Sequence, residues 1–144
     1  MRVVALSLAL LAGSGGLSIS VSSTQAGARP VAMNLRFRAE LQCGTAAGPP
    51  IVVSLPAGEH VPAAVSRAAV LIDGHPATRV TVSGHRVTIA VARPEVICDV
   101  IAPGPIKIAI TRGAGLGNPQ HAGTYAVFVR RGSLTVSGTL KIGG

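Results

Sequence analysis

Five basic residues are the side chains of this chain best suited to bind a ligand: Arg36, Arg38, Arg130, Arg131 and Lys141. Arg36, Arg38 and Lys141 fall on predicted strands, whereas Arg130-Arg131-Gly132 is predicted to be the turn of the last hairpin. Arginine donates paired hydrogen bonds to carboxylate and phosphate groups, and lysine supplies a point charge. If the first and the last predicted strands are neighbours, the five residues form one anion-binding face for an acidic polymer of the cell envelope. An ordinary solvated face is the alternative.

Other kinds of ligand site have less support. The glycine-rich stretch 113–117 could cradle a phosphate only if a helix followed it, and a strand is predicted there. The four histidines all fall in predicted turns, without acidic or thiolate partners at fixed spacing, although a pair of His60 and His75 is conceivable. We therefore predict no metal site and no cofactor.

Catalytic groups are few. Outside residues 1–26 the acidic residues are Glu40, Glu59, Asp73, Glu95 and Asp99. Glu95 and Asp99 are the one pair close in sequence that could act on a sugar, and no G-x-S-x-G motif marks a serine nucleophile. The sequence predicts a protein that is not an enzyme, with a small secreted enzyme using a loop-based site as an alternative.

Charge and aromatic content narrow the choice of partner. The formal net charge is +8 at pH 7, which favours polyanionic partners. The chain has one Tyr, two Phe and no Trp, and we expect these three rings in the core. Platforms for sugars and for single-stranded nucleic acids use exposed rings for stacking, so neither a sugar-binding platform nor specific nucleic-acid binding is predicted.

The N-terminal segment has the features of a secretory signal over residues 1–26. Arg2 is a minimal basic region, residues 3–12 are an apolar stretch, and Thr24-Gln25-Ala26 is a small-residue cleavage site. Cleavage after Ala28 and an uncleaved anchor are the alternatives. The apolar stretch is about half as long as a membrane span requires, and no second one follows, so no transmembrane segment is predicted in the mature chain.

The two cysteines, Cys43 and Cys98, fit an exported chain, where an even number of thiols usually forms bridges. We expect a disulfide between them, with two buried thiols as the alternative. After the signal, residues 27–32 are expected to form a linker and residues 33–144 a single domain.

Short segments of alternating apolar and polar residues fill this domain. In residues 34–41, Leu35, Phe37 and Ala39 share one face, with arginines on the other. The Asp73-Gly74 turn and the Ser83-Gly84-His85 hairpin separate such segments, and Pro76 is expected to prevent strand pairing directly after the first turn. The eight expected strands cover residues 34–41, 51–55, 69–72, 78–83, 86–91, 106–110, 125–129 and 134–142. This spacing predicts an all-β sandwich or small barrel.

Four pieces of the chain resemble an immunoglobulin-like domain that recurs in bacterial secreted and cell-surface proteins. They are LPAGEHVP at 55–62, AVLIDGHPA at 69–77, VTVSGHRVTIAV at 80–91 and AGLGNPQHAGTYAVFV at 114–129. The resemblance implies an immunoglobulin-like β-sandwich that acts as a surface spacer or adhesion module, and it carries no catalytic residues. The chain departs from the usual pattern by standing alone and by having two cysteines.

Together these features predict a secreted or envelope-associated bacterial β-sandwich that serves as a structural or interaction module. Its partner would be an acidic envelope polymer or another surface protein. A diffusible polyanion-binding protein that uses the arginine-rich face is the main alternative.

Overall fold

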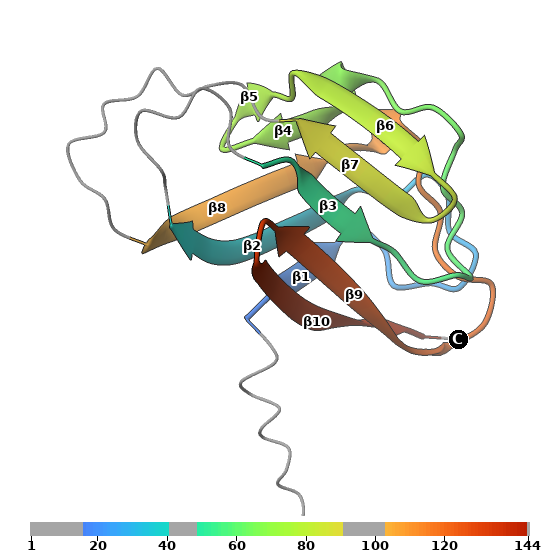
Figure 1. Cartoon of the computed structure of the whole chain (residues 1–144). Helices are drawn as coiled ribbons and strands as arrows, with labels where there is room; N and C mark the ends of the chain where they lie inside the picture. Colours follow the sequence, from blue (N-terminus) through green and yellow to red (C-terminus); the bar gives the residue numbers. More distant parts are fainter. Residues whose placement is uncertain (1–15, 41–48, 91–102, 144) are drawn as a thin grey trace, which may run out of the picture.

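The computed structural model describes residues 16–40, 49–90 and 103–143, and it is all β apart from two short 3-10 turns. Two five-stranded antiparallel sheets pack face to face as a sandwich (Figure 1). The first sheet has the order β1-β2-β8-β4-β5 and the second β10-β9-β3-β7-β6. The elements are β1 (Ser18–Val21), β2 (Met33–Glu40), β3 (Ile51–Ser54), η1 (Arg67–Ala69), β4 (Val70–Ile72), β5 (His75–Pro76), β6 (Arg79–Ser83), β7 (Arg86–Ala90), β8 (Pro103–Ile110), η2 (Arg112–Ala114), β9 (Gly123–Arg131) and β10 (Leu134–Ile142).

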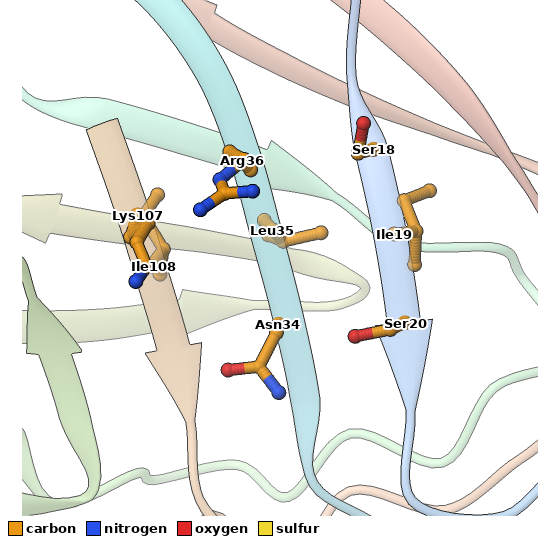
Figure 2. Close-up of a pocket in the computed structure, with 8 residues that line it drawn as sticks. All are labelled: Ser18, Ile19, Ser20, Asn34, Leu35, Arg36, Lys107 and Ile108. Carbon is orange, nitrogen blue, oxygen red and sulfur yellow. The ribbon is translucent and has the colours of Figure 1, made fainter. Parts of the chain in front are cut away.

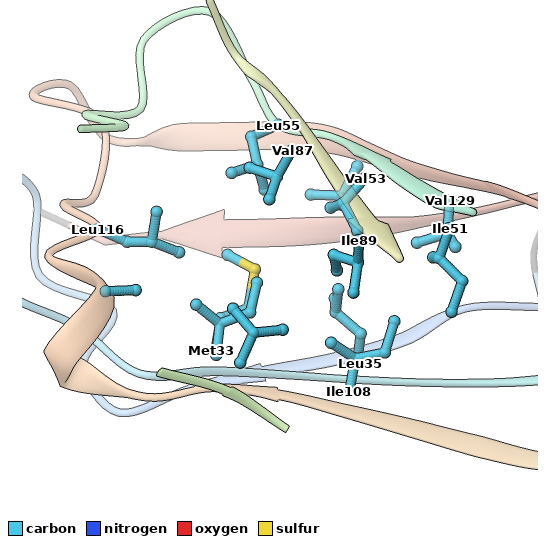
Figure 3. Packing of buried hydrophobic residues seen from close by; sticks show 14 of the residues in the cluster. Met33, Leu35, Ile51, Val53, Leu55, Val87, Ile89, Ile108, Leu116 and Val129 are labelled. Atoms are coloured by element: carbon cyan, nitrogen blue, oxygen red, sulfur yellow. The ribbon is translucent and has the colours of Figure 1, made fainter. Parts of the chain in front are cut away.

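The core follows from the alternation of apolar residues along each strand, because successive side chains of a strand point to opposite faces. Met33, Leu35 and Phe37 of β2 are almost completely buried, whereas Asn34, Arg36 and Arg38 between them are exposed. Side chains of the two sheets meet in one cluster, in which Met33, Leu35 and Ile108 face Val53 and Ile89 (Figure 3). The predicted all-β class and the sandwich arrangement are therefore confirmed.

Two of the ten strands were not among the eight expected. β5 follows the Asp73-Gly74 turn, where both residues have positive φ as the sequence indicates. Pro76 was expected to prevent pairing, yet it pairs with Leu71. A proline is tolerated there because β5 is an edge strand, whose second side needs no backbone donor.

The other unexpected strand, β1, lies within the segment assigned to the secretory signal. It pairs with β2 over four residues, from Ser18 opposite Arg36 to Val21 opposite Met33. Val31, in the expected linker, is completely buried. The described fold therefore extends to the N-terminal side of residue 33, where the domain was expected to begin.

The hairpins agree with the sequence except in one detail. β6 and β7 are joined at Gly84, which has a φ of +62°. In the last hairpin the turn lies at Gly132, with a φ of +61°, and Arg130 and Arg131 belong to β9 rather than to the turn. Cys43 and Cys98 lie outside the described residues, so the disulfide stays a prediction.

Candidate anion-binding face

The five basic residues singled out in the sequence lie in different sheets. Arg36 and Arg38 are in β2 of the first sheet, whereas Arg130 and Arg131 are in β9 and Lys141 is in β10 of the second. The grouping expected from the sequence required the strand of Arg36 to neighbour the last strand. Instead β1 is the neighbour of β2 at this edge, so the structure does not bring the five residues together.

Lys107 of β8 is the residue that joins Arg36. The two are direct partners in the antiparallel pair of β2 and β8, and both are exposed on the outer side of the first sheet. Arg38 is exposed two positions further along β2, which is about 7 Å along the strand. Partners across an antiparallel pair are about 5 Å apart at Cβ, so three cations share a small area. We call Arg36, Arg38 and Lys107 the basic face.

Polar groups border the basic face on the side of β1. Figure 2 shows Arg36 and Lys107 on adjacent strands, with Ser18, Ser20 and Asn34 nearby. Ser18 is the partner of Arg36 and Ser20 the partner of Asn34 in the pairing of β1 with β2. Hydroxyl and carboxamide groups can donate hydrogen bonds to the same anions that the cations attract.

The surface is hollowed at this place, but shallowly. One depression of about 340 Å³ is lined by Ser18, Ile19, Ser20, Asn34, Leu35, Arg36, Lys107 and Ile108. A second, of about 430 Å³, is lined by Gly16, Ser18, Arg36, Phe37, Arg38 and Pro105. Arg36 and Ser18 line both depressions, so Arg36 is central to the hollowed surface.

One carboxylate lies at the margin of the basic face. Asp73 Oδ1 accepts a hydrogen bond from the Lys107 backbone N–H at 3.0 Å, and the Asp73 N–H donates to the Lys107 carbonyl at 2.8 Å. These bonds fasten the β4–β5 turn to β8 and fix the Lys107 backbone. The Asp73 carboxylate reduces the positive potential at the Lys107 end of the basic face.

The basic residues of the second sheet are dispersed. Arg130 is the partner of Thr135 and Lys141 the partner of Thr124, which separates them by six residues, or about 20 Å, along β10. Arg131 is half-buried, its Nε donates to the Pro49 carbonyl at 3.2 Å, and burial lowers its pKa. Arg131 therefore fastens the segment before β3 and is not available to a ligand as Arg36 is.

The aromatic residues also differ from expectation. Phe37 is buried, and Tyr125 is half-buried with its hydroxyl donating to the His121 carbonyl at 2.6 Å. Phe128 is 45% exposed on the outer side of β9, and it is the one large hydrophobic side chain exposed in the described parts of the chain. The expectation that all three rings are in the core is wrong for Phe128.

A buried carboxyl group, Glu59, lies where two loops meet and was not singled out in the sequence. His60 and Gly117 form an antiparallel bridge with two backbone hydrogen bonds, which places Glu59 opposite Asn118. Both side chains are 2% exposed. Neither Glu59 carboxyl oxygen has a hydrogen-bond partner, and neither does Asn118 Oδ1. Burial raises the pKa of Glu59 to about 8, so this carboxyl is mostly protonated at pH 7.

The Gly117-Asn118 pair explains part of the AGLGNP motif. A Cβ at Gly117 would lie 2.8 Å from Arg29 Cδ and 3.1 Å from His60 Cβ, so any larger residue would have to displace these two side chains. The Asn118 carboxamide donates to the carbonyls of Ser23 at 2.8 Å and Gln25 at 2.9 Å. The motif therefore has a structural function, which is to join the N-terminal segment to the loop before β9.

Groups suited to metal binding or catalysis do not converge in the described residues. His60, His75, His85 and His121 are all exposed, with His75 in β5 of the first sheet and His85 between two strands of the second. No group of three or more His, Cys, Asp or Glu residues that could bind a metal occurs within residues 16–40, 49–90 and 103–143. Glu95 and Asp99 lie outside these ranges. The same ranges contain no helix long and apolar enough to cross a membrane.

Comparison with known proteins identifies a similar fold but no family. No family model matches the chain, and no curated protein matches it. Among the solved structures that are similar is BslA, described as a bacterial hydrophobin. It aligns with a TM-score of 0.55 and 16% sequence identity, over 88% of this chain and 96% of BslA. At this identity the similarity concerns the fold alone.

Proposed function

We propose that this protein is a secreted, non-enzymatic, immunoglobulin-like β-sandwich of the bacterial cell envelope that binds an acidic polymer through the basic face. The observation that carries the proposal is the register of β2 and β8, in which Arg36 and Lys107 are partners and Arg38 follows on the same outer surface. An anionic polymer carries repeated charges, and cations about 5–7 Å apart can contact several of them at once.

The shape of the surface favours a polymer over a small anion. The depressions beside Arg36 are shallow and border an open strand surface, whereas small ligands are usually enclosed in clefts that cover most of their area. Exposed aromatic rings, which sugar platforms and single-strand nucleic-acid binders use, are absent from the described part of the basic face. Charge complementarity supplies the specificity in this proposal, and binding weakens as salt screens it.

Secretion rests on the sequence features of residues 1–26, and the immunoglobulin-like type rests on the resemblance described above. The likeness to BslA, at 16% identity, supports the fold alone. A hydrophobin-like activity would need an extended apolar surface, and Phe128 is the one large hydrophobic side chain exposed in the described residues. We therefore base the proposal on charge rather than on an apolar surface.

The test compares two matched double variants of the full chain on an anionic polysaccharide matrix such as heparin. Arg36→Thr/Lys107→Thr removes two of the three positive charges of the basic face, and Arg130→Thr/Lys141→Thr removes the same amount of charge from the second sheet. Each exposed ion contact is worth about 0.2–1 kcal/mol, so we expect the first variant to bind roughly 2- to 30-fold more weakly and to elute at lower salt. The control should elute close to the unmodified protein. Equal shifts for both variants would show that net charge alone governs retention and would refute the proposal.

Fractionation of the producing cells separates the envelope-bound form from the diffusible alternative. The protein should appear in the fraction released from the envelope by a salt wash, because salt screens contacts between exposed charges. Recovery entirely in the culture supernatant would favour a diffusible polyanion-binding protein. Retention through high salt would indicate a specific protein partner.

A further inference from the structure

The segment from residue 16 to residue 27 is joined to both sheets, although its sequence suggests a leader peptide. β1 extends the first sheet through four residue pairs with β2. Just before β1, Leu17 is buried, and its N–H donates to the Ser137 carbonyl of β10 at 3.2 Å. β1 thereby connects the edges of the two sheets on one side of the sandwich, as Figure 1 shows.

Residues that follow β1 are held just as firmly. The buried Asn118 carboxamide donates to the carbonyls of Ser23 and Gln25, at 2.8 and 2.9 Å. The Gly143 N–H donates to the Thr24 carbonyl at 2.8 Å, and the Gly27 N–H donates to the Pro119 carbonyl at 2.9 Å. Without residues up to 26, the Asn118 amide would lose both of its acceptors, which is costly for a buried donor.

The rest of the chain is also shaped to receive this segment. A Cβ at Gly138 would overlap the Leu17 carbonyl oxygen and lie 3.1 Å from Ile19 Cδ1, so glycine at this position of β10 allows the close approach of the N-terminal segment. Gly138 and Asn118 lie in different parts of the sequence, and the contacts that each makes with residues 17–25 explain why a glycine and an asparagine are found there. A domain that began after Ala26 would have no use for either adaptation.

We infer that the leader is removed within the small-residue stretch 13–16 and that the mature protein keeps β1. The residues of this stretch are all small, as is required around the scissile bond of a leader. The alternative sites after Ala26 and Ala28 would remove β1 and expose the edge of β2, with its unpaired backbone groups. This inference rests on the proposed secretion and adds the position of the mature N-terminus.

The test is to express the full-length gene in a bacterium that exports it and to determine the N-terminus and the intact mass of the chain found outside the cytoplasm. An N-terminus between residues 13 and 17 supports the inference. An exported chain that begins at residue 27 or 29, or that keeps Met1, overturns it. A chain found only inside the cells with Met1 overturns the proposed secretion as well, which distinguishes the two failures.

A second measurement addresses the role of β1 directly. We compare a cytoplasmic variant that starts at Gly16 with one that starts at Gly27, each after an initiator Met. The longer variant should melt cooperatively, and the shorter one should melt at least about 10 °C lower or show no cooperative transition. Equal melting temperatures would show that β1 is dispensable and would overturn the structural basis of the inference.

Discussion

Glu59 gives the chain a dependence of stability on pH that one substitution should remove. Its carboxyl is 2% exposed and has no hydrogen-bond partner, and burial raises its pKa from the ordinary 4.5 to about 8. The unfolded chain releases this proton near pH 4.5, whereas the folded chain keeps it until about pH 8. The free energy of unfolding is therefore not reduced by Glu59 below pH 4.5. It decreases between pH 4.5 and pH 8, and above pH 8 the ionisation of Glu59 causes no further decrease.

The size of the effect follows from the interval between the two pKa values. Each pH unit in that interval lowers the free energy of unfolding by about 1.36 kcal/mol. The total decrease is roughly 3 kcal/mol at pH 7 and roughly 5 kcal/mol above pH 8. A domain of this size is stable by about 5–15 kcal/mol, so the loss is a large fraction of the total. If the two loops separate at the His60–Gly117 bridge, water can reach the ionised carboxylate. The decrease in the free energy of unfolding then cannot exceed the free energy needed to separate the loops.

The measurement is urea unfolding of the unmodified protein and of Glu59→Gln at pH 5, 7 and 9. The glutamine variant should differ from the parent by about 1 kcal/mol or less at pH 5, and it should exceed the parent by several kcal/mol at pH 9. Ile72→Val serves as the control, because it shortens a buried side chain and should lower stability by about 1 kcal/mol at every pH. A parallel pH dependence in the parent and in Glu59→Gln would refute the assignment of a buried, unpaired carboxyl.

Two further predictions concern the N-terminal seam and the cysteines. Gly138→Ala should lower the free energy of unfolding by about 2 kcal/mol or more, because its Cβ would meet the backbone of Leu17. Gly58→Ala is the control in thermal melting, because Gly58 has no positive φ and its Cβ would make only an ordinary contact with Pro119 Cβ at 3.5 Å; an equal loss in both variants would contradict the clash. Glu40 pairs with Pro103, and in the sequence Cys43 follows Glu40 by three residues and Cys98 precedes Pro103 by five; the disulfide between the two cysteines stays a prediction. Thiol titration of the denatured, unreduced protein should find no free thiol, and reduction should cost about 4 kcal/mol for a loop of about 55 residues; two reactive thiols would contradict the bridge.

The strands that the sequence predicts well are those whose pattern is local. The alternation of Leu35, Phe37 and their arginine neighbours specifies which side of β2 is buried, and the Asp73-Gly74 turn specifies its own backbone. β1 was missed because the sequence around Ile19 continues the small and apolar character of a leader, and its partners Arg36 and Ser137 are distant in the chain. A pattern of residues within one segment contains no information on such partners.

The candidate site shows the same limit. The sequence correctly predicts that Arg36 and Arg38 point to solvent, since this follows from the period of the strand. It does not predict that Lys107 lies beside Arg36, because that depends on which strands are neighbours and in which register. The burial of Glu59 is likewise a product of tertiary structure, since the PAGEHVP stretch is typical of an exposed turn.

The seam between the N-terminal segment and β10 also determines how the domain would respond to tension. The bridges Gly16–Ser137 and Gln25–Gly143 are both parallel, so the two segments run in the same direction. A force that pulls residue 16 and residue 143 apart therefore acts at opposite ends of the seam and loads its contacts in shear. Contacts loaded in shear bear the force together, whereas contacts loaded from one end separate in succession. The seam is thus oriented to resist stretching between residue 16 and residue 143, the two ends of the described chain.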